Sequence, residues 1–160
     1  MEVVDMVREI ALVGDPVLRR PAQPVKKVNA AIRQLLDDMV ETMRAAPGVG
    51  LAAPQVGVSK RIIVIETEEG LLELINPEVV RSSGREVAME GCLSVPNKAG
   101  EVERATQVTV TGLDRQERRI WVEAQGFQAR ALQHELDHLD GILFIDRALS
   151  LQDLTDEGED

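Results

Sequence analysis

His134 and His138 stand four residues apart in the stretch QHELDHLDGILF, and the chain has no other histidine. On a helix, residues four apart differ in direction by only about 40°, so both imidazoles project from one face. Two imidazoles placed in this way can occupy two corners of a tetrahedral metal site. Glu135 follows the first histidine, where a carboxylate can act as general base on water held at the metal. The spacing therefore predicts a catalytic metal site on a helix.

A catalytic site of this kind usually has three protein ligands and one open position. The metzincin pattern HExxHxxGxxH fits through Gly141, but Phe144 stands where the third histidine belongs. Asp140 and Asp146 are nearby carboxylates in a stretch that favours a turn and a short strand. Cys92, the lone thiol, is the better candidate, because a thiolate binds zinc and ferrous iron strongly. A small buried cysteine with no ligand role is the alternative.

The segment GVGLAAPQ (48–55) matches the GxGxxA spacing of dinucleotide-binding loops. That loop must follow a strand and open a helix, whereas here a helix is expected before it and Pro54 lies within it. NAD binding is therefore rejected. The glycines allow the backbone to approach a ligand closely, and Gln55 ends the segment with an amide that can donate to an oxyanion. A packed turn is the alternative.

The elements that must position these groups follow from periodicity. An apolar stripe from Ile32 to Met43 predicts an amphipathic helix that begins after Asn29 and ends at Pro47–Gly48. A second helix over 127–139 carries the two histidines, and the proline-rich segment 11–25 is expected to be irregular. Alternating or continuous apolar runs predict five strands, over 61–66, 71–76, 85–90, 107–113 and 118–124.

These elements predict an α+β fold: a single domain with antiparallel or mixed β-sheets around the metal-binding helix, plus an N-terminal amphipathic helix. The domain is expected over residues 1–150, with an acidic, frayed tail over 151–160.

Composition and charge exclude several classes of function. The net charge of −10 and the low aromatic content of 2% argue against DNA or RNA binding and against an anionic membrane surface. No apolar run approaches the roughly 20 residues that span a bilayer, and no signal peptide is evident. With one cysteine, the chain cannot form an internal disulfide. A reducing, cytoplasmic location is the expectation.

The segments GVGLAAPQ, EGCLS and QHELDH resemble, in order and approximate separation, the three motifs of bacterial peptide deformylases. The stretches GDPVLRRPAQPV and GEVERA are also similar to that family, so the resemblance covers nearly the whole chain up to Arg147. Together the three motifs are highly specific. The resemblance implies removal of the formyl group from the N-terminal formylmethionine of nascent polypeptides, with release of formate.

The resemblance also implies a ligand set. Cys92, His134 and His138 would bind the metal. Ferrous iron (Fe2+) is the physiological ion of the family, and Zn2+, Ni2+ or Co2+ can occupy the site. A site with these ligands does not by itself distinguish iron from zinc.

The resemblance also implies catalytic and substrate-binding roles for residues that match motif positions of the family. Glu135 would be the general acid and base, and the Gln55 amide and the Leu93 backbone N–H would stabilise the oxyanion. The Gly50 backbone would align the substrate. Phe127 and Ala131 match positions that line the methionine pocket, although plain core contacts are the alternative for both.

Glu90 belongs to the EGCLS motif and is expected among the substrate-binding residues. A pairing with Arg130 would fix the bend that aims Cys92. Lys98 follows the cysteine motif, but it is not clearly equivalent to the basic residue with which some members contact the peptide backbone. Substrate preference beyond methionine is therefore left open.

The expected partners are nascent N-formylmethionyl peptides. Some family members dock on the ribosome through a basic C-terminal helix, and the acidic tail of this chain argues against that mode, though not against transient ribosome contact. Two other classes of function stay open on the residues alone. One is a zinc metallopeptidase whose third ligand is a downstream carboxylate, and the other is a metal site without catalysis, either structural or in an inactive family member.

Overall fold

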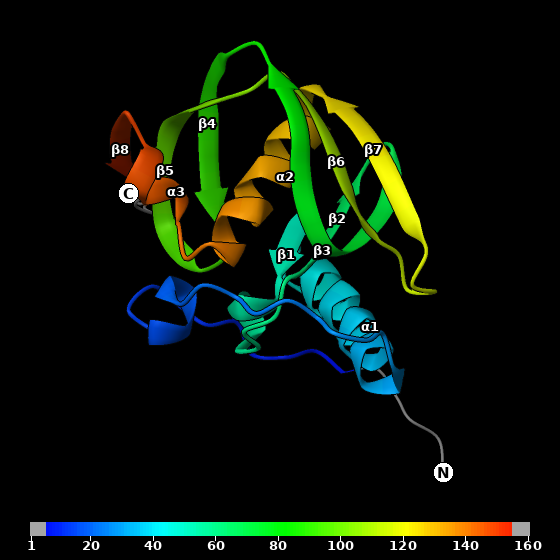
Figure 1. The fold of residues 1–160 in the computed structure, drawn as a ribbon. Helices are drawn as coiled ribbons and strands as arrows, with labels where there is room; N and C mark the ends of the chain where they lie inside the picture. Colours follow the sequence, from blue (N-terminus) through cyan, green and yellow to red (C-terminus); the bar gives the residue numbers. More distant parts are fainter. Residues whose placement is uncertain (1–5, 155–160) are drawn as a thin grey trace.

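Helix α2 (Gly126–Leu139) lies between two β-sheets, and this arrangement is the core of the fold (Figure 1). The computed structural model describes residues 6–154. All neighbouring strands within each sheet run antiparallel. The larger sheet has the order β1-β2-β3-β6-β7 and the smaller one β4-β5-β8. The expected α+β architecture around the histidine helix is confirmed.

The strands of the larger sheet are β1 (Gly50–Ala52), β2 (Ile62–Thr67), β3 (Gly70–Ser83), β6 (Gln107–Leu113) and β7 (Arg119–Gln125). Those of the smaller sheet are β4 (Glu86–Cys92), β5 (Val95–Arg104) and β8 (Ser150–Asp153). The remaining elements are helices α1 (Ala30–Ala45) and α3 (Phe144–Arg147) and the 3-10 helices η1 (Pro16–Arg19) and η2 (Ala53–Val56).

Helix α1 begins where the sequence predicts, because the Asn29 side chain accepts the Ile32 backbone N–H at 3.0 Å. Its apolar stripe packs on β1 and β2 at one end of the molecule (Figure 1). Leu36, Met39 and Met43 are fully buried there. Burying each such side chain contributes about 1.5–3 kcal/mol, so this contact anchors the start of the larger sheet.

Helix α2 packs its apolar face on the larger sheet. Leu132 and Leu139 are inaccessible to solvent and join Ile63, Leu74 and Val110 in one cluster. Because the helix face opposite this cluster looks toward the smaller sheet, polar residues on it can meet residues of β4 and β5.

Two segments differ from the expectations. The segment expected to form a short strand contains helix α3, because Asp146 accepts the Leu143 backbone N–H at 2.9 Å and closes a single helical turn. Residues expected to belong to a frayed tail from position 151 form β8, which pairs with β5. The part of that tail over 155–160 lies outside the described residues.

The segment 11–25, expected to be irregular, contains the short 3-10 helix η1, and its first residues contact the loops of the site. The Ala11 N–H donates to the Gln55 carbonyl at 2.7 Å, and the Val13 N–H donates to the Ser94 carbonyl at 2.8 Å. This segment therefore holds η2 close to the turn after β4.

Most large apolar side chains are buried, but Trp121 on β7 is 61% exposed. It lies on the face of β7 that turns away from helix α2, since its neighbours Ile120 and Val122 pack against the core. Among the described residues, no helix is both long and apolar enough to cross a bilayer.

Candidate metal centre

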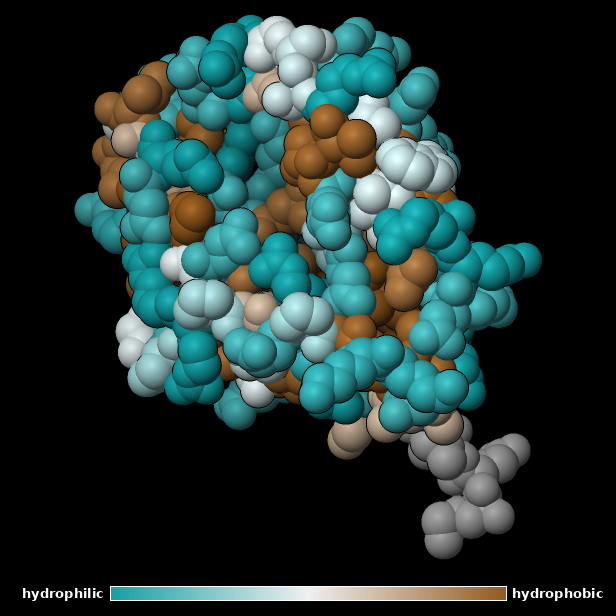
Figure 2. Space-filling view, in the orientation of Figure 1, coloured by the Kyte–Doolittle hydropathy of each residue, from teal (hydrophilic) through white to brown (hydrophobic). Residues whose placement is uncertain are grey.

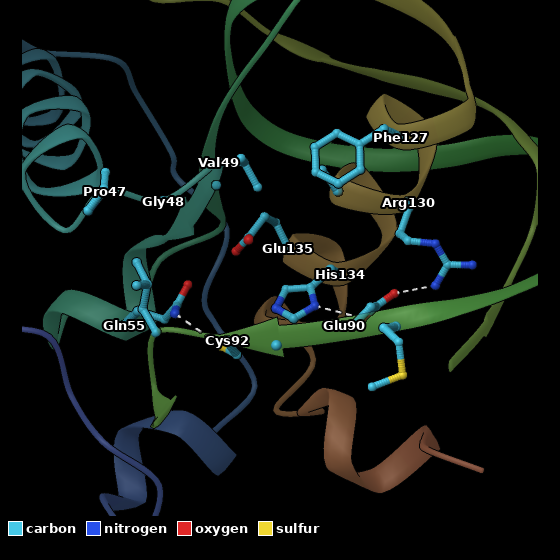
Figure 3. Close-up of a pocket in the computed structure, with 15 residues that line it drawn as sticks. Pro47, Gly48, Val49, Gln55, Glu90, Cys92, Phe127, Arg130, His134 and Glu135 are labelled. Carbon is cyan, nitrogen blue, oxygen red and sulfur yellow. Dashed lines mark hydrogen bonds and ion pairs between the residues drawn. The ribbon is translucent and has the colours of Figure 1, made fainter. Parts of the chain in front are cut away.

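Cys92, His134 and His138 converge at the centre of the molecule. One potential ligand atom from each lies within 4.8 Å of the other two. The Cys92 Sγ is 3.4 Å from His138 Nε2. Figure 3 shows His134 directly above the strand that carries Cys92 and Glu90. Within the described residues, this is the group of three whose side chains are close enough to share one metal ion.

Local backbone geometry aims Cys92 at the helix. Strand β4 shifts its register between Glu90 and Cys92, and Cys92 then pairs with Val95 across a tight turn. Glu90 pairs with Gly100 and Cys92 with Val95, so the extra residues of this irregularity lie in β5 and the alternation of side chains along β4 is unbroken. The two-residue spacing from Glu90 then places both side chains toward α2.

Glu90 is in direct contact with His134. Its Oε1 lies 2.9 Å from His134 Nδ1, and Arg104 donates to both of its carboxylate oxygens at 2.9 Å. Arg130 donates to Oε2 at 2.6 Å, so the predicted pairing of Glu90 with Arg130 is confirmed (Figure 3). Both oxygens are engaged by protein groups, although Glu90 also lines the cleft, so its place among the substrate-binding residues stays a prediction.

The charge of Glu90 is fixed by these contacts. Burial on its own would raise the pKa of the Glu90 carboxyl, but hydrogen bonds from Arg104 and His134 outweigh it and lower the pKa to about 2. Glu90 is therefore ionised at neutral pH and accepts the Nδ1 proton of His134. Nε2 of His134 is then the ring nitrogen at which a metal would replace a proton.

The electrostatics of the ligand set fit a bound cation. Burial lowers the pKa of His134, yet contacts with Cys92, Glu90 and Glu135 outweigh it and raise this pKa to about 10. These contacts therefore favour a positive charge at His134. Burial, with the nearby His134 and Arg104, lowers the pKa of His138 to about 3, which keeps that ring neutral and able to bind a metal. A thiolate with two imidazoles suits Zn2+ and Fe2+.

Glu135 is buried beside this group. Among the described residues its Oε1 has no hydrogen-bond partner. Burial raises the pKa of its carboxyl to about 7, with His134 and Arg104 opposing the shift and Glu90 adding to it. A carboxylate with a pKa near neutrality can both accept and return a proton.

Gln55 points its amide at the same centre. Its Nε2 lies 3.6 Å from Cys92 Sγ and 3.0 Å from Ser94 Oγ, while its Oε1 accepts the Ala52 backbone N–H at 2.9 Å. The amide is thus held at both ends, with its donor side facing Cys92 (Figure 3).

A cleft of about 340 Å³ opens over these groups. Gly50, Leu93, Phe127 and Ala131 are among the residues that line it, and their roles toward the substrate stay predictions. Phe127 is 59% exposed at the rim, whereas Ala131 is buried. In Figure 2, hydrophobic side chains gather beside a hollow in the upper half of the face shown.

Sequence reasoning missed three groups around the site: Arg104, Asp137 and Ser94. Arg104 is 4% exposed and Ser94 is inaccessible to solvent. Asp137 lies within the HELDH motif itself, and a buried charge on a helix face is the signal that could have found it. Lys98 forms an ion pair with Asp153 on β8 instead of facing the cleft.

Comparisons with known proteins agree with this geometry. Residues 7–153 match the family model described as polypeptide deformylase. The chain belongs to the polypeptide deformylase family. A curated peptide deformylase from Halothermothrix orenii is 56% identical over 147 residues, covering 91% of this chain and 96% of that protein. One from Symbiobacterium thermophilum is 52% identical over 163 residues, covering 100% of this chain and 73% of that protein.

Solved structures of the family superpose closely. Peptide deformylase from Thermotoga maritima matches with a TM-score of 0.88 at 42% identity, over 92% of this chain and all of that one. The enzyme from Synechococcus elongatus, solved in complex with actinonin, has a TM-score of 0.88 at 42% identity, over 94% of this chain and 83% of that one. Like its family, this chain is a metal-dependent hydrolase that removes the N-formyl group from the N-terminal formylmethionine of nascent polypeptides and releases formate.

Proposed function

We propose that the deformylase reaction of this chain uses a metal ion held by Cys92, His134 and His138, and that the ion used in the cell is Fe2+. The supporting observation is the convergence of these three ligand atoms within 4.8 Å of one another, with both histidines buried. Zn2+, Ni2+ or Co2+ would fit the same donors. When bound, the metal supplies a Lewis acid that polarises the formyl carbonyl and acidifies water.

Glu135 is the proposed general acid and base. It accepts a proton from the attacking water and later delivers one to the nitrogen of the leaving amine, which releases formate. Its burial and its raised pKa, about 7, support both halves of this role, since neither transfer is then strongly uphill at neutral pH.

The oxyanion that develops on the formyl oxygen is stabilised by two proposed donors, the Gln55 amide and the Leu93 backbone N–H. The Gln55 amide is held rigidly by its contacts with Ala52 and Ser94, so it needs no reorganisation as charge develops. Losing one donor of this kind typically costs about 3–4 kcal/mol of transition-state stabilisation.

The substrate is proposed to lie in the cleft with its backbone along Gly50 and its methionine side chain against Phe127 and Ala131. Glu90 is not itself a proposed ligand; it orients the His134 ring through its contact with Nδ1. The proposed partners are nascent N-formylmethionyl peptides in the cytoplasm, reached without docking through the acidic C-terminal end.

The first experiment measures formate release from a formyl-methionyl peptide by protein loaded anaerobically with Fe2+. Glu135→Ala should bind one equivalent of metal and lose nearly all formate release. Cys92→Ala should lose metal binding as well. An acetyl-methionyl peptide of the same sequence serves as the control substrate, and peptide-bond cleavage in place of formate release would contradict the assignment.

A further inference from the structure

Asp137 belongs to the helix that carries both histidines but turns toward two arginines instead of the metal ligands. Arg104 donates to its Oδ2 at 2.6 Å. Arg147 donates from Nε to Oδ2 at 2.6 Å and from Nη2 to Oδ1 at 3.1 Å. Asp137 therefore accepts hydrogen bonds from β5 and from α3 at once.

Arg104 spans the distance from Asp137 to Glu90. Its Nε and Nη2 bond the two oxygens of Glu90, and its remaining nitrogen, Nη1, bonds Asp137. With 4% of the side chain exposed, the guanidinium has no room to adopt another orientation. Because a planar guanidinium fixes all three nitrogens together, the position of Asp137 helps to determine where the Glu90 carboxylate lies.

The Glu90 carboxylate in turn holds His134. Its Oε1 lies 2.9 Å from Nδ1, which keeps the ring proton on that nitrogen. His138 has no such support, because no described group bonds its Nδ1. The two histidine ligands are therefore unequal, and only His134 is connected to a network of fixed charges.

We propose that Arg104 and Asp137 are positioning residues that act through Glu90 to fix the His134 ring for metal binding, with Arg147 as their outer support. The inference rests on the proposed metal ligands. It extends the functional network from the cleft to α3, whose Arg147 side chain is 46% exposed on the far side of Asp137.

The test measures the dissociation constant of Co2+, by anaerobic competition with a chromophoric chelator, for Asp137→Asn and Arg104→Lys. Both variants should bind Co2+ at least several-fold more weakly than the parent chain, with about 10–100-fold, the usual effect of removing the direct partner of a metal-ligating histidine, as the upper range. Arg147→Gln changes a half-exposed residue and should weaken binding in the same direction by a smaller factor. Because Arg147 is half-exposed, the Arg147→Gln variant still tests the proposal if the Asp137 or Arg104 variant does not fold.

Glu73→Gln is the matched control. Glu73 accepts two hydrogen bonds from Arg115, at 2.8 and 2.6 Å, and its side chain is 14% exposed, against 13% for Asp137. This substitution removes a comparable ion pair away from the cleft. It should destabilise the fold to a similar degree and leave the Co2+ dissociation constant unchanged.

An NMR signal distinguishes a positioning role of these residues from a general loss of stability. In the Zn2+-loaded protein, the Nδ1 proton of His134 should give a slowly exchanging resonance downfield of the amides. It should shift or disappear in Asp137→Asn and persist in Glu73→Gln. Unchanged Co2+ affinity and an unchanged resonance in both Asp137→Asn and Arg147→Gln would overturn the proposal while leaving the metal site intact. Failure of the parent chain to bind Co2+ would overturn both the ligand assignment and the proposal that rests on it.

Discussion

At Gly50 the backbone of β1 runs beside Glu135, the proposed general base. A Cβ atom built on Gly50 would lie 2.6 Å from Glu135 Oε2 and 3.0 Å from its Cγ. Any larger residue at this position must displace Glu135. The glycine is thus needed for the position of a neighbouring side chain and not for an unusual torsion.

Gly50→Ala should therefore reduce the rate of deformylation by about 100-fold, since a displacement near 1 Å of a catalytic group can have that effect. Metal content should stay at the parent level, because the three atoms nearest the added methyl all belong to Glu135 and not to a proposed metal ligand. Steady-state formate release measures the expected loss of rate, and metal analysis of the same preparation measures the metal content. A variant with parental activity would show that Glu135 has room to move without loss of function.

Single residues were predictable where a short motif carries them. The histidine spacing and the resemblance together indicated Cys92, His134 and His138, and the structure brings them together. Arg104 and Asp137 were not identified, because their roles depend on contacts between residues 33 positions apart in the chain. No local pattern records such a contact.

Among the elements, α1 is joined to the N-terminal segment through one buried carboxylate. Asp38 is 1% exposed and accepts the Met6 backbone N–H at 3.0 Å and the Arg8 guanidinium at 2.9 and 3.0 Å. Burial alone would raise the pKa of Asp38, but the contacts with Met6, Gln34 and Arg8 outweigh it, so the pKa is lowered.

Asp38→Asn should lower the free energy of unfolding by about 2 kcal/mol at pH 7, the scale of a lost hydrogen bond to a charged group. A lowered pKa means that the contribution of the carboxylate is complete above its unfolded value of 3.8 and is lost as the pH falls through the folded value. Urea unfolding at pH 7, 5 and 3 should show the two proteins converging only at the lowest pH. A constant difference at all three values would contradict this cause.

Strand β8 depends on a close approach at Gly100, which pairs with Leu151. A Cβ atom on Gly100 would collide with the Ser150 carbonyl oxygen, a backbone atom that cannot move aside without breaking the pairing. Gly100→Ala should detach β8 while α2 and the proposed metal ligands stay in place. Hydrogen exchange should then accelerate at residues 150–153 and remain slow in α2, and equal protection in both proteins would argue against it.

Element prediction succeeded where periodicity was strong and failed where tertiary contacts decide. The two long helices and the β6–β7 hairpin follow the predicted ranges closely. Strand β5 was not predicted, since its sequence VPNKAGEVER includes proline, glycine and charged residues, and only pairing with β4 and β8 makes it a strand. The short helix α3 depends on a single aspartate contact.

At the scale of the whole molecule, a bound metal would connect the two sheets. Cys92 belongs to the smaller sheet, whereas the histidines lie on α2, which packs on the larger one. A site assembled from distant segments exists only in the folded chain, so metal binding stabilises the fold by mass action.

At a free metal concentration 100 times the dissociation constant, the stabilisation should be about 2.7 kcal/mol. For a chain of this size that corresponds to a rise in Tm of about 5–10 °C. Scanning calorimetry with and without Co2+ measures the shift. Cys92→Ala should show none, and an equal shift in that variant would indicate binding elsewhere.

Trp121, described above on the outer face of β7, is the only tryptophan, and the chain has no tyrosine. Its indole is already largely in water in the native state, and it does not line the cleft. Intrinsic fluorescence should therefore change little on unfolding or on ligand binding. Optical studies of this enzyme will need another chromophore, such as cobalt at the thiolate or a dye attached near the cleft.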